Sequence, residues 1–116
     1  MYPLRYHTFS INKWLSYPKE HQILNIASEL QRANSWIRRQ RPDLVNLCYE
    51  RVLELIDLTV EDPRWGHQLK ELLRAREMLG QLYSELSKNS ELNQEILRNL
   101  VLLNPEAYRI LYPGTD

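Results

Sequence analysis

Strand-forming sequence is nearly absent from this chain. Only three of its 116 residues are glycine, and no segment alternates valine, isoleucine or threonine with polar residues. A β-sheet protein needs such alternating segments, joined by turns that often contain glycine. Leucine, glutamate, glutamine, arginine and alanine recur instead at helical spacing. These residues favour helices, so the sequence predicts an all-α fold.

Cysteine, long apolar runs and net charge are also scarce, and each absence excludes a class of protein. Cys48 is the one cysteine, so an internal disulfide and a cysteine-based zinc site are excluded, which fits a reducing cytoplasm. No segment approaches the roughly 18 apolar residues of a membrane span, and residues 1–18 lack the apolar run of a signal peptide. Fifteen basic and fifteen acidic residues cancel, so no overall field attracts nucleic acid or anionic lipid. We expect a soluble cytoplasmic protein without a cofactor or a membrane partner.

Prolines divide the chain into helical segments. Pro18, Pro42, Pro63 and Pro105 each stand just before a helical pattern, where the fixed φ angle and the missing N–H suit a first turn. The expected helices cover about residues 19–40, 43–60, 64–88 and 91–103, with a short terminal helix at about 105–112. The residues expected to cap the helices that follow them are Asp62, Ser90 and Asn104.

Four long helices with short connections favour one arrangement. Residues 43–60 are apolar around most of the helix circumference, which predicts the most buried of the four helices. Short connections favour antiparallel neighbours, so we expect an antiparallel up-down four-helix bundle that forms a single domain over residues 1–116. We also expect the aromatic-rich N-terminal segment, residues 1–18, to pack on the bundle or on a partner. Its aromatic residues are Tyr2, Tyr6, Phe9, Trp14 and Tyr17.

Arginines gather near the end of the first predicted helix. Arg38 and Arg39 fall in its last turn, where cations interact favourably with the helix dipole and with unpaired carbonyl groups. A nucleic-acid patch is the alternative, because an aromatic ring lies among the arginines and bases stack on such rings. The residues of this candidate basic patch are Arg32, Trp36, Arg38, Arg39 and Arg41.

The second predicted helix carries an acidic stripe. Glu50, Glu54, Asp57 and Glu61 follow one another at helical spacing. Carboxylates so spaced can share a metal ion, as in helical nucleotide pyrophosphatases and di-iron bundles. Those proteins also need an E-x-x-E or E-x-x-H pair, and this sequence has neither. We therefore expect a solvated helix face, with a degenerate nucleotide-handling site around Glu50, Glu54 and Asp57 as a weaker alternative.

One arginine interrupts an apolar helix face. Arg76 stands between Leu72 and Leu79, where a leucine is expected. A buried guanidinium needs a carboxylate and further polar partners. Counting residues from the turns of antiparallel helices places polar residues of the other helices at about the same height as Arg76. The sequence therefore predicts a polar layer of Asn34, Glu50, Arg76 and Asn99. Three roles are open for this layer: fixing the helix register, forming an oligomer interface, or binding a small anion.

No motif in the chain is specific to an enzyme or a family. We expect a small non-enzymatic protein-interaction or regulatory protein, which acts with a protein partner or as a homo-oligomer such as a dimer. A nucleic-acid-associated accessory protein that uses the basic patch is the alternative. No residue is predicted to be catalytic or to bind a metal or a cofactor.

Overall fold

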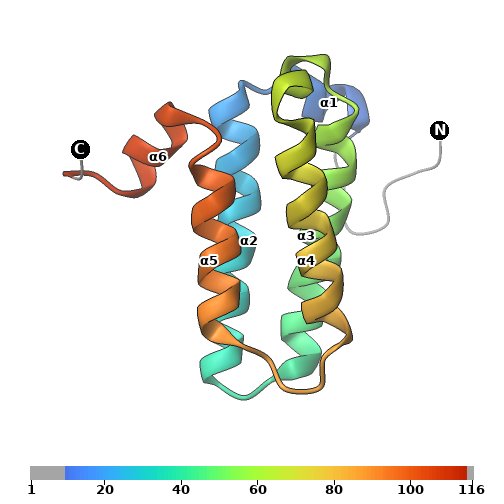
Figure 1. Ribbon diagram of the computed structural model, residues 1–116, viewed down its shortest axis with the longest axis vertical. Coiled ribbons are helices and arrows are strands. Elements are labelled where there is room, and N and C mark those ends of the chain that lie inside the picture. Colours follow the sequence, from blue (N-terminus) through green and yellow to red (C-terminus); the bar gives the residue numbers. More distant parts are fainter. Residues whose placement is uncertain (1–9, 115–116) are drawn as a thin grey trace.

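Residues 10–114, the part of the chain that the computed structural model describes, fold into helices joined by short connections (Figure 1). No strand occurs within these residues, and the all-α prediction is confirmed. The elements are α1 (Ile11–Ser16), α2 (Lys19–Arg38), α3 (Pro42–Val60), the 3-10 helix η1 (Pro63–Gln68), α4 (Leu69–Ser84), α5 (Ser90–Val101) and α6 (Pro105–Leu111).

Most helices begin where the sequence predicts. Prolines occupy the first turns of α3, η1 and α6, where their missing N–H needs no partner. Asp62 caps η1, and Asn104 caps α6 by accepting a hydrogen bond from the backbone N–H of Ala107 at 2.8 Å. The prediction that Ser90 caps the next helix is wrong by one position, because the side chain of Asn89 accepts the first-turn hydrogen bond of α5.

Three long helices end earlier than predicted, and one of them, α5, ends at Val101 instead of residue 103. α2 ends at Arg38, and Gln40 then adopts a left-handed conformation with a φ angle of 59°, which turns the chain toward α3. α4 ends at Ser84, where Lys88 Nζ donates hydrogen bonds to carbonyl groups that the helix leaves unpaired. The accepting carbonyl oxygens belong to Leu82 (2.8 Å), Tyr83 (3.1 Å) and Glu85 (2.6 Å).

The four long helices lie side by side along the long axis of the molecule. α2 contacts α3 and α5, and α4 contacts the same two helices. In Figure 1, α2 and α4 run from the upper end to the lower end, and α3 and α5 run back. α1 and α6 lie at the upper end, where α1 contacts α3, and α6 contacts α2 and α5.

The apolar core fills the space between these helices. α3 contributes eight buried residues, more than any other described helix, as the wide apolar arc of residues 43–60 predicts. Trp14 of α1 and Trp65 of η1 are fully buried at the upper end. The other N-terminal aromatic residues predicted to pack are Tyr17, which is half-buried, and Tyr2, Tyr6 and Phe9, which lie outside the described residues. Among the described helices, none combines the length and the apolar character that a membrane span requires.

Candidate functional site

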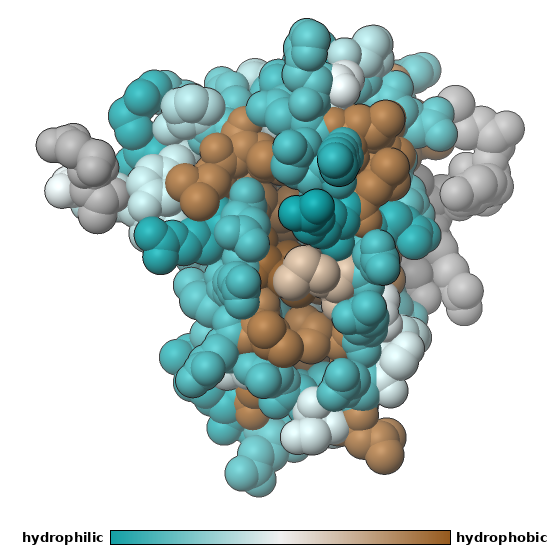
Figure 2. All heavy atoms as spheres, viewed as in Figure 1, coloured by the Kyte–Doolittle hydropathy of each residue, from teal (hydrophilic) through white to brown (hydrophobic). Residues whose placement is uncertain are grey.

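A groove with an apolar floor runs between α4 and α5. Its volume is about 320 Å³. Ala75 lines it midway along α4, where a single methyl group leaves space between the two helices unfilled. Figure 2 faces α4 and α5, and it shows apolar side chains gathered between them with polar side chains on both sides. The lining residues are Glu71, Arg74, Ala75, Met78, Ile96, Asn99, Leu100 and Leu103.

The rim of the groove is polar and exposed. Glu71 and Arg74 of α4 and Asn99 of α5 all reach solvent. Two further apolar side chains are exposed in this part of the chain: Leu92 of α5 is 39% exposed, and Leu102, directly after α5, is 52% exposed. An apolar centre surrounded by charged and polar side chains is typical of surfaces that bind another polypeptide.

The burial predicted for Arg76 is wrong. Its side chain is 47% exposed and forms an ion pair with Asp57 of α3, with Nε 2.5 Å from Oδ1 and Nη2 3.3 Å from Oδ2. Arg76 lies at the edge of α4 beside α3, where a long side chain can cover apolar surface and still reach water. The sequence correctly predicts an ion pair for this arginine, but the pair is at the surface.

The other members of the predicted polar layer lie in different surroundings. Asn34 is half-buried near the lower end of α2 and accepts a hydrogen bond from Ser90 Oγ at 2.6 Å. Asn99 is exposed on the groove between α4 and α5, and Glu50 is half-buried on α3. A shared buried layer is therefore the wrong description, because Asn99 faces the space beside Ala75 and not the core.

Part of the predicted basic patch comes together at the lower end of α2. The guanidinium of Arg39 lies over the ring of Trp36, 5.2 Å from the ring centroid. Trp36 is half-buried and packs against the core, and Arg38 is exposed. Cation–π contact accounts for the position of Arg39 without a nucleic-acid partner.

The remaining arginines of the patch bind carboxylates. Arg32 Nη1 lies 3.0 Å from Glu29 Oε1, and Arg41 donates two hydrogen bonds to Asp43, at 3.2 and 3.3 Å. The hydrogen bonds from Arg41 lower the pKa of the Asp43 carboxyl. These ion pairs offset much of the positive charge that the sequence places here.

The acidic stripe does not assemble a metal centre. Glu50, Glu54 and Asp57 are half-buried, Glu61 is exposed, and Asp57 pairs with an arginine of α4. Within residues 10–114, no group of three or more histidine, cysteine or acidic side chains is arranged to hold a metal ion. Cys48 is buried, which raises the pKa of its thiol and favours the unreactive protonated form.

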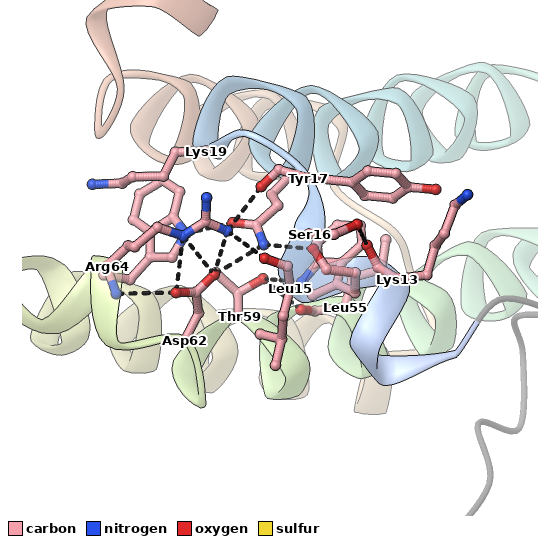
Figure 3. A network of polar contacts seen from close by, with 12 residues as sticks. Lys13, Leu15, Ser16, Tyr17, Lys19, Leu55, Thr59, Asp62 and Arg64 are labelled. Carbon is pink, nitrogen blue, oxygen red and sulfur yellow. Dashed lines mark hydrogen bonds and ion pairs between the residues drawn. The ribbon is translucent and has the colours of Figure 1, made fainter.

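A buried polar network that the sequence analysis did not predict joins α1 to the long helices (Figure 3). Trp14 Nε1 donates to Thr59 Oγ1 of α3 at 3.2 Å, and Gln22 Nε2 of α2 donates to the carbonyl oxygen of Trp14 at 2.9 Å. Gln22 Oε1 in turn accepts from Trp65 Nε1 at 2.7 Å. We name this network the polar clasp, and its members are Trp14, Gln22, Thr59, Asp62, Arg64 and Trp65.

Asp62 carries the negative charge of the polar clasp. Its side chain is 3% exposed, lies 2.7 Å from Arg64 Nη2, and accepts a hydrogen bond from Gln22 Nε2 at 3.1 Å. The hydrogen bonds from Arg64 lower the pKa of Asp62 from its ordinary 3.8 to about 2. Arg64 Nη2 also donates to the carbonyl oxygens of Leu15 (3.0 Å) and Tyr17 (2.8 Å) at the end of α1 (Figure 3). The clasp therefore holds α1 in place.

A second buried polar contact joins three helices. Asn93 of α5 is fully buried, donates from Nδ2 to the carbonyl oxygen of Leu30 in α2 at 3.0 Å, and accepts from the Tyr49 hydroxyl of α3 at 2.8 Å. Burial raises the pKa of the Tyr49 phenol, so the hydroxyl remains a neutral donor. Such contacts could be suspected from the sequence where a polar residue lies on an apolar helix face. Gln22, four positions before Ile26 in α2, is an example.

Comparison with known proteins gives no relative for this chain. No family model matches it, and neither a curated protein nor a solved structure does. The groove between α4 and α5 and the charged side chains around it are the features of the described residues that can indicate a function.

Proposed function

We propose that the chain is a small non-enzymatic protein-interaction or regulatory protein of the cytoplasm, built as an antiparallel up-down four-helix bundle. The groove between α4 and α5 is the observation that supports this function. Its floor is apolar and its rim is charged, which is the arrangement expected of a surface that packs against another polypeptide.

The energetic argument concerns the floor of the groove. Met78, Ile96 and Leu100 form much of this floor, and Ala75 leaves room above them. A leucine or methionine side chain of a partner, fully buried there, gains about 1.5–3 kcal/mol from the hydrophobic effect. Several such contacts across the face give a specific complex, while the charged rim selects the orientation of the partner.

A bulky side chain in the groove tests this function. Asn99→Trp replaces an exposed rim residue and fills the space beside Ala75, so binding is lost while the fold is kept. Gln94→Trp is the matched control, because Gln94 is an exposed residue of the same helix and does not line the groove. Affinity capture from native lysate, after nuclease treatment, should retain a protein partner with the wild type and with Gln94→Trp. Equal capture by Asn99→Trp would contradict the proposed role of the groove.

A nucleic-acid-associated accessory role is the second candidate, and the exposed cation of Arg38 near the end of α2 favours it. Trp36 supplies an aromatic ring, and exposed Arg38 supplies a free cation at the end of α2. For this role, retention on single-stranded RNA or DNA should fall steeply with salt and disappear in Arg38→Ala plus Arg39→Ala. Capture that survives nuclease treatment and this double substitution supports the protein-interaction role instead.

A further inference from the structure

We infer that the partner of the α4/α5 face is a second copy of this chain, packed face to face with its helices antiparallel to those of the first. The inference rests on the proposed function, since it names the occupant of the same groove. The α4/α5 face is defined here as the groove together with the exposed charged residues that flank it on these two helices. Its distribution of charge carries the argument.

The upper end of the α4/α5 face is basic. Lys70 and Arg74 are exposed on the first half of α4, and Arg98 is exposed on the second half of α5, which lies at the same level. Glu71 is the one acidic residue of α4 among them. Together these four residues carry a net positive charge. Glu77, which is exposed at the middle of α4, belongs to neither end.

The lower end of the same face is acidic. Glu91 and Glu95 are exposed on the first half of α5, and Glu85 is exposed just after α4. Lys88 is also near this end, but it is half-buried and its ammonium group donates hydrogen bonds to three carbonyl oxygens at the end of α4. The ammonium group therefore points at the helix terminus, and the exposed surface carries the negative charge.

A face that is basic at one end and acidic at the other is complementary to itself after a half turn. The required twofold axis lies in the plane of the interface, perpendicular to the helices and level with the middle of the face. It places the basic end of each copy on the acidic end of the other. This axis stacks α4 on α4 of the partner and α5 on α5. Lys70 of one copy then lies over the partner's Glu85, Arg98 lies over the partner's Glu95, and the same contacts recur at the opposite end. A parallel arrangement would bring like charges together and is disfavoured.

The size of the face sets the expected strength of the dimer. α4 has 16 residues, and a helix rises about 1.5 Å per residue and is about 10 Å wide. Two such helices present a projected face of roughly 20 by 24 Å, which is at the small end of specific interfaces. Interfaces of this size are generally weak, so we expect a reversible dimer that dissociates in the micromolar range.

Charge reversal tests both the partner and the orientation. In the full chain, Glu85→Lys plus Glu95→Lys makes both ends of the face basic, and Lys70→Glu plus Arg98→Glu makes both ends acidic. Each double variant alone should associate at least about tenfold more weakly than the wild type. An equimolar mixture of the two variants should regain dimerisation, because every contact in the mixed dimer again joins opposite charges.

Sedimentation equilibrium over about 5 to 500 µM measures these associations across the expected range. Arg38→Glu plus Arg39→Glu is the control, because this pair lies at the end of α2, away from the face, and should leave the mass distribution unchanged. Recovery in the mixture also shows that both variants fold, since a misfolded chain cannot regain a specific partner.

Three results would overturn the inference: a monomeric wild type at about 500 µM, unchanged dimerisation in either double variant, or a mixture that stays monomeric. The proposed function is tested separately. If the wild type is monomeric and Asn99→Trp still abolishes capture of another protein, the groove binds a different partner and only the second-copy inference fails.

Discussion

The polar clasp predicts a specific loss of stability at low pH, centred on Asp62. In Asp62→Asn the side-chain amide keeps one oxygen. This oxygen can still accept a hydrogen bond from the backbone N–H of Arg64 and so cap η1. The substitution removes the negative charge that faces the Arg64 guanidinium, and it replaces Oδ2, which accepts from Gln22 and Arg64, with an amide group. The variant therefore separates the ion pair from the helix cap.

The magnitude follows from the lowered pKa of Asp62. A pKa of about 2 in the folded protein, against an ordinary value of 3.8, corresponds at 1.36 kcal/mol per pH unit to about 2 kcal/mol of unfolding free energy. Because the folded-state pKa is the lower one, this contribution is fully present above about pH 4 and is lost as the pH falls toward 2. Asp62→Asn should thus be about 2 kcal/mol less stable than the wild type at pH 6 and nearly equal to it at pH 2.

Urea denaturation at a series of pH values, followed by tryptophan fluorescence, measures this difference. Trp14 and Trp65 are fully buried within the clasp, so unfolding of this end changes their emission. Asp57→Asn is the matched control, because Asp57 forms an exposed ion pair in which the side chains are 41% and 47% exposed, and such pairs contribute about 0–1 kcal/mol. A stability difference for Asp62→Asn that stays constant between pH 6 and pH 2 would refute the reasoning.

Three further predictions concern other parts of the fold. Arg76→Ala should lower the unfolding free energy by less than about 1 kcal/mol, because the ion pair of Arg76 with Asp57 is exposed. A loss of about 3 kcal/mol or more in chemical denaturation would show that Arg76 is buried in solution. Gln40→Gly should raise the melting temperature and add about 0.5–1 kcal/mol, since glycine adopts the left-handed φ of 59° without strain, and a lower melting temperature would contradict this. Tyr49→Phe should cost about 1–3 kcal/mol in urea denaturation, because Asn93 loses a buried donor; an unchanged midpoint would mean that water replaces the hydroxyl.

Helix positions follow from the sequence because their signals are local. Proline fixes its own φ angle, so Pro42, Pro63 and Pro105 mark the starts of α3, η1 and α6 without reference to the rest of the fold. Helix ends are harder to predict. The end of α4 depends on Lys88, which donates back to carbonyl groups three to six positions earlier, and no periodic pattern indicates that contact.

The sequence does not predict which side chains contact one another across the fold. The hydrogen bonds of Gln22 and Trp14 in the polar clasp join residues between 8 and 45 positions apart, and only the assembled fold brings them together. Arg76 shows the opposite error. Its position on an apolar face suggests burial, but a side chain of that length at the edge of a helix reaches water. The groove at Ala75 depends on the distance between two helices, which alanine alone does not reveal.

The contact at Asn93 also has a consequence for the order in which the helices assemble. Asn93 of α5 needs a carbonyl oxygen from α2 and a hydroxyl from α3 at the same time, so its amide is satisfied only after those two helices have paired. α2 and α3 are neighbours in the chain, and contacts between neighbouring helices form early because little chain entropy is lost. We therefore expect α5 to dock late, onto a preformed pair. Substitution of Tyr49 should accordingly accelerate unfolding far more than it slows refolding.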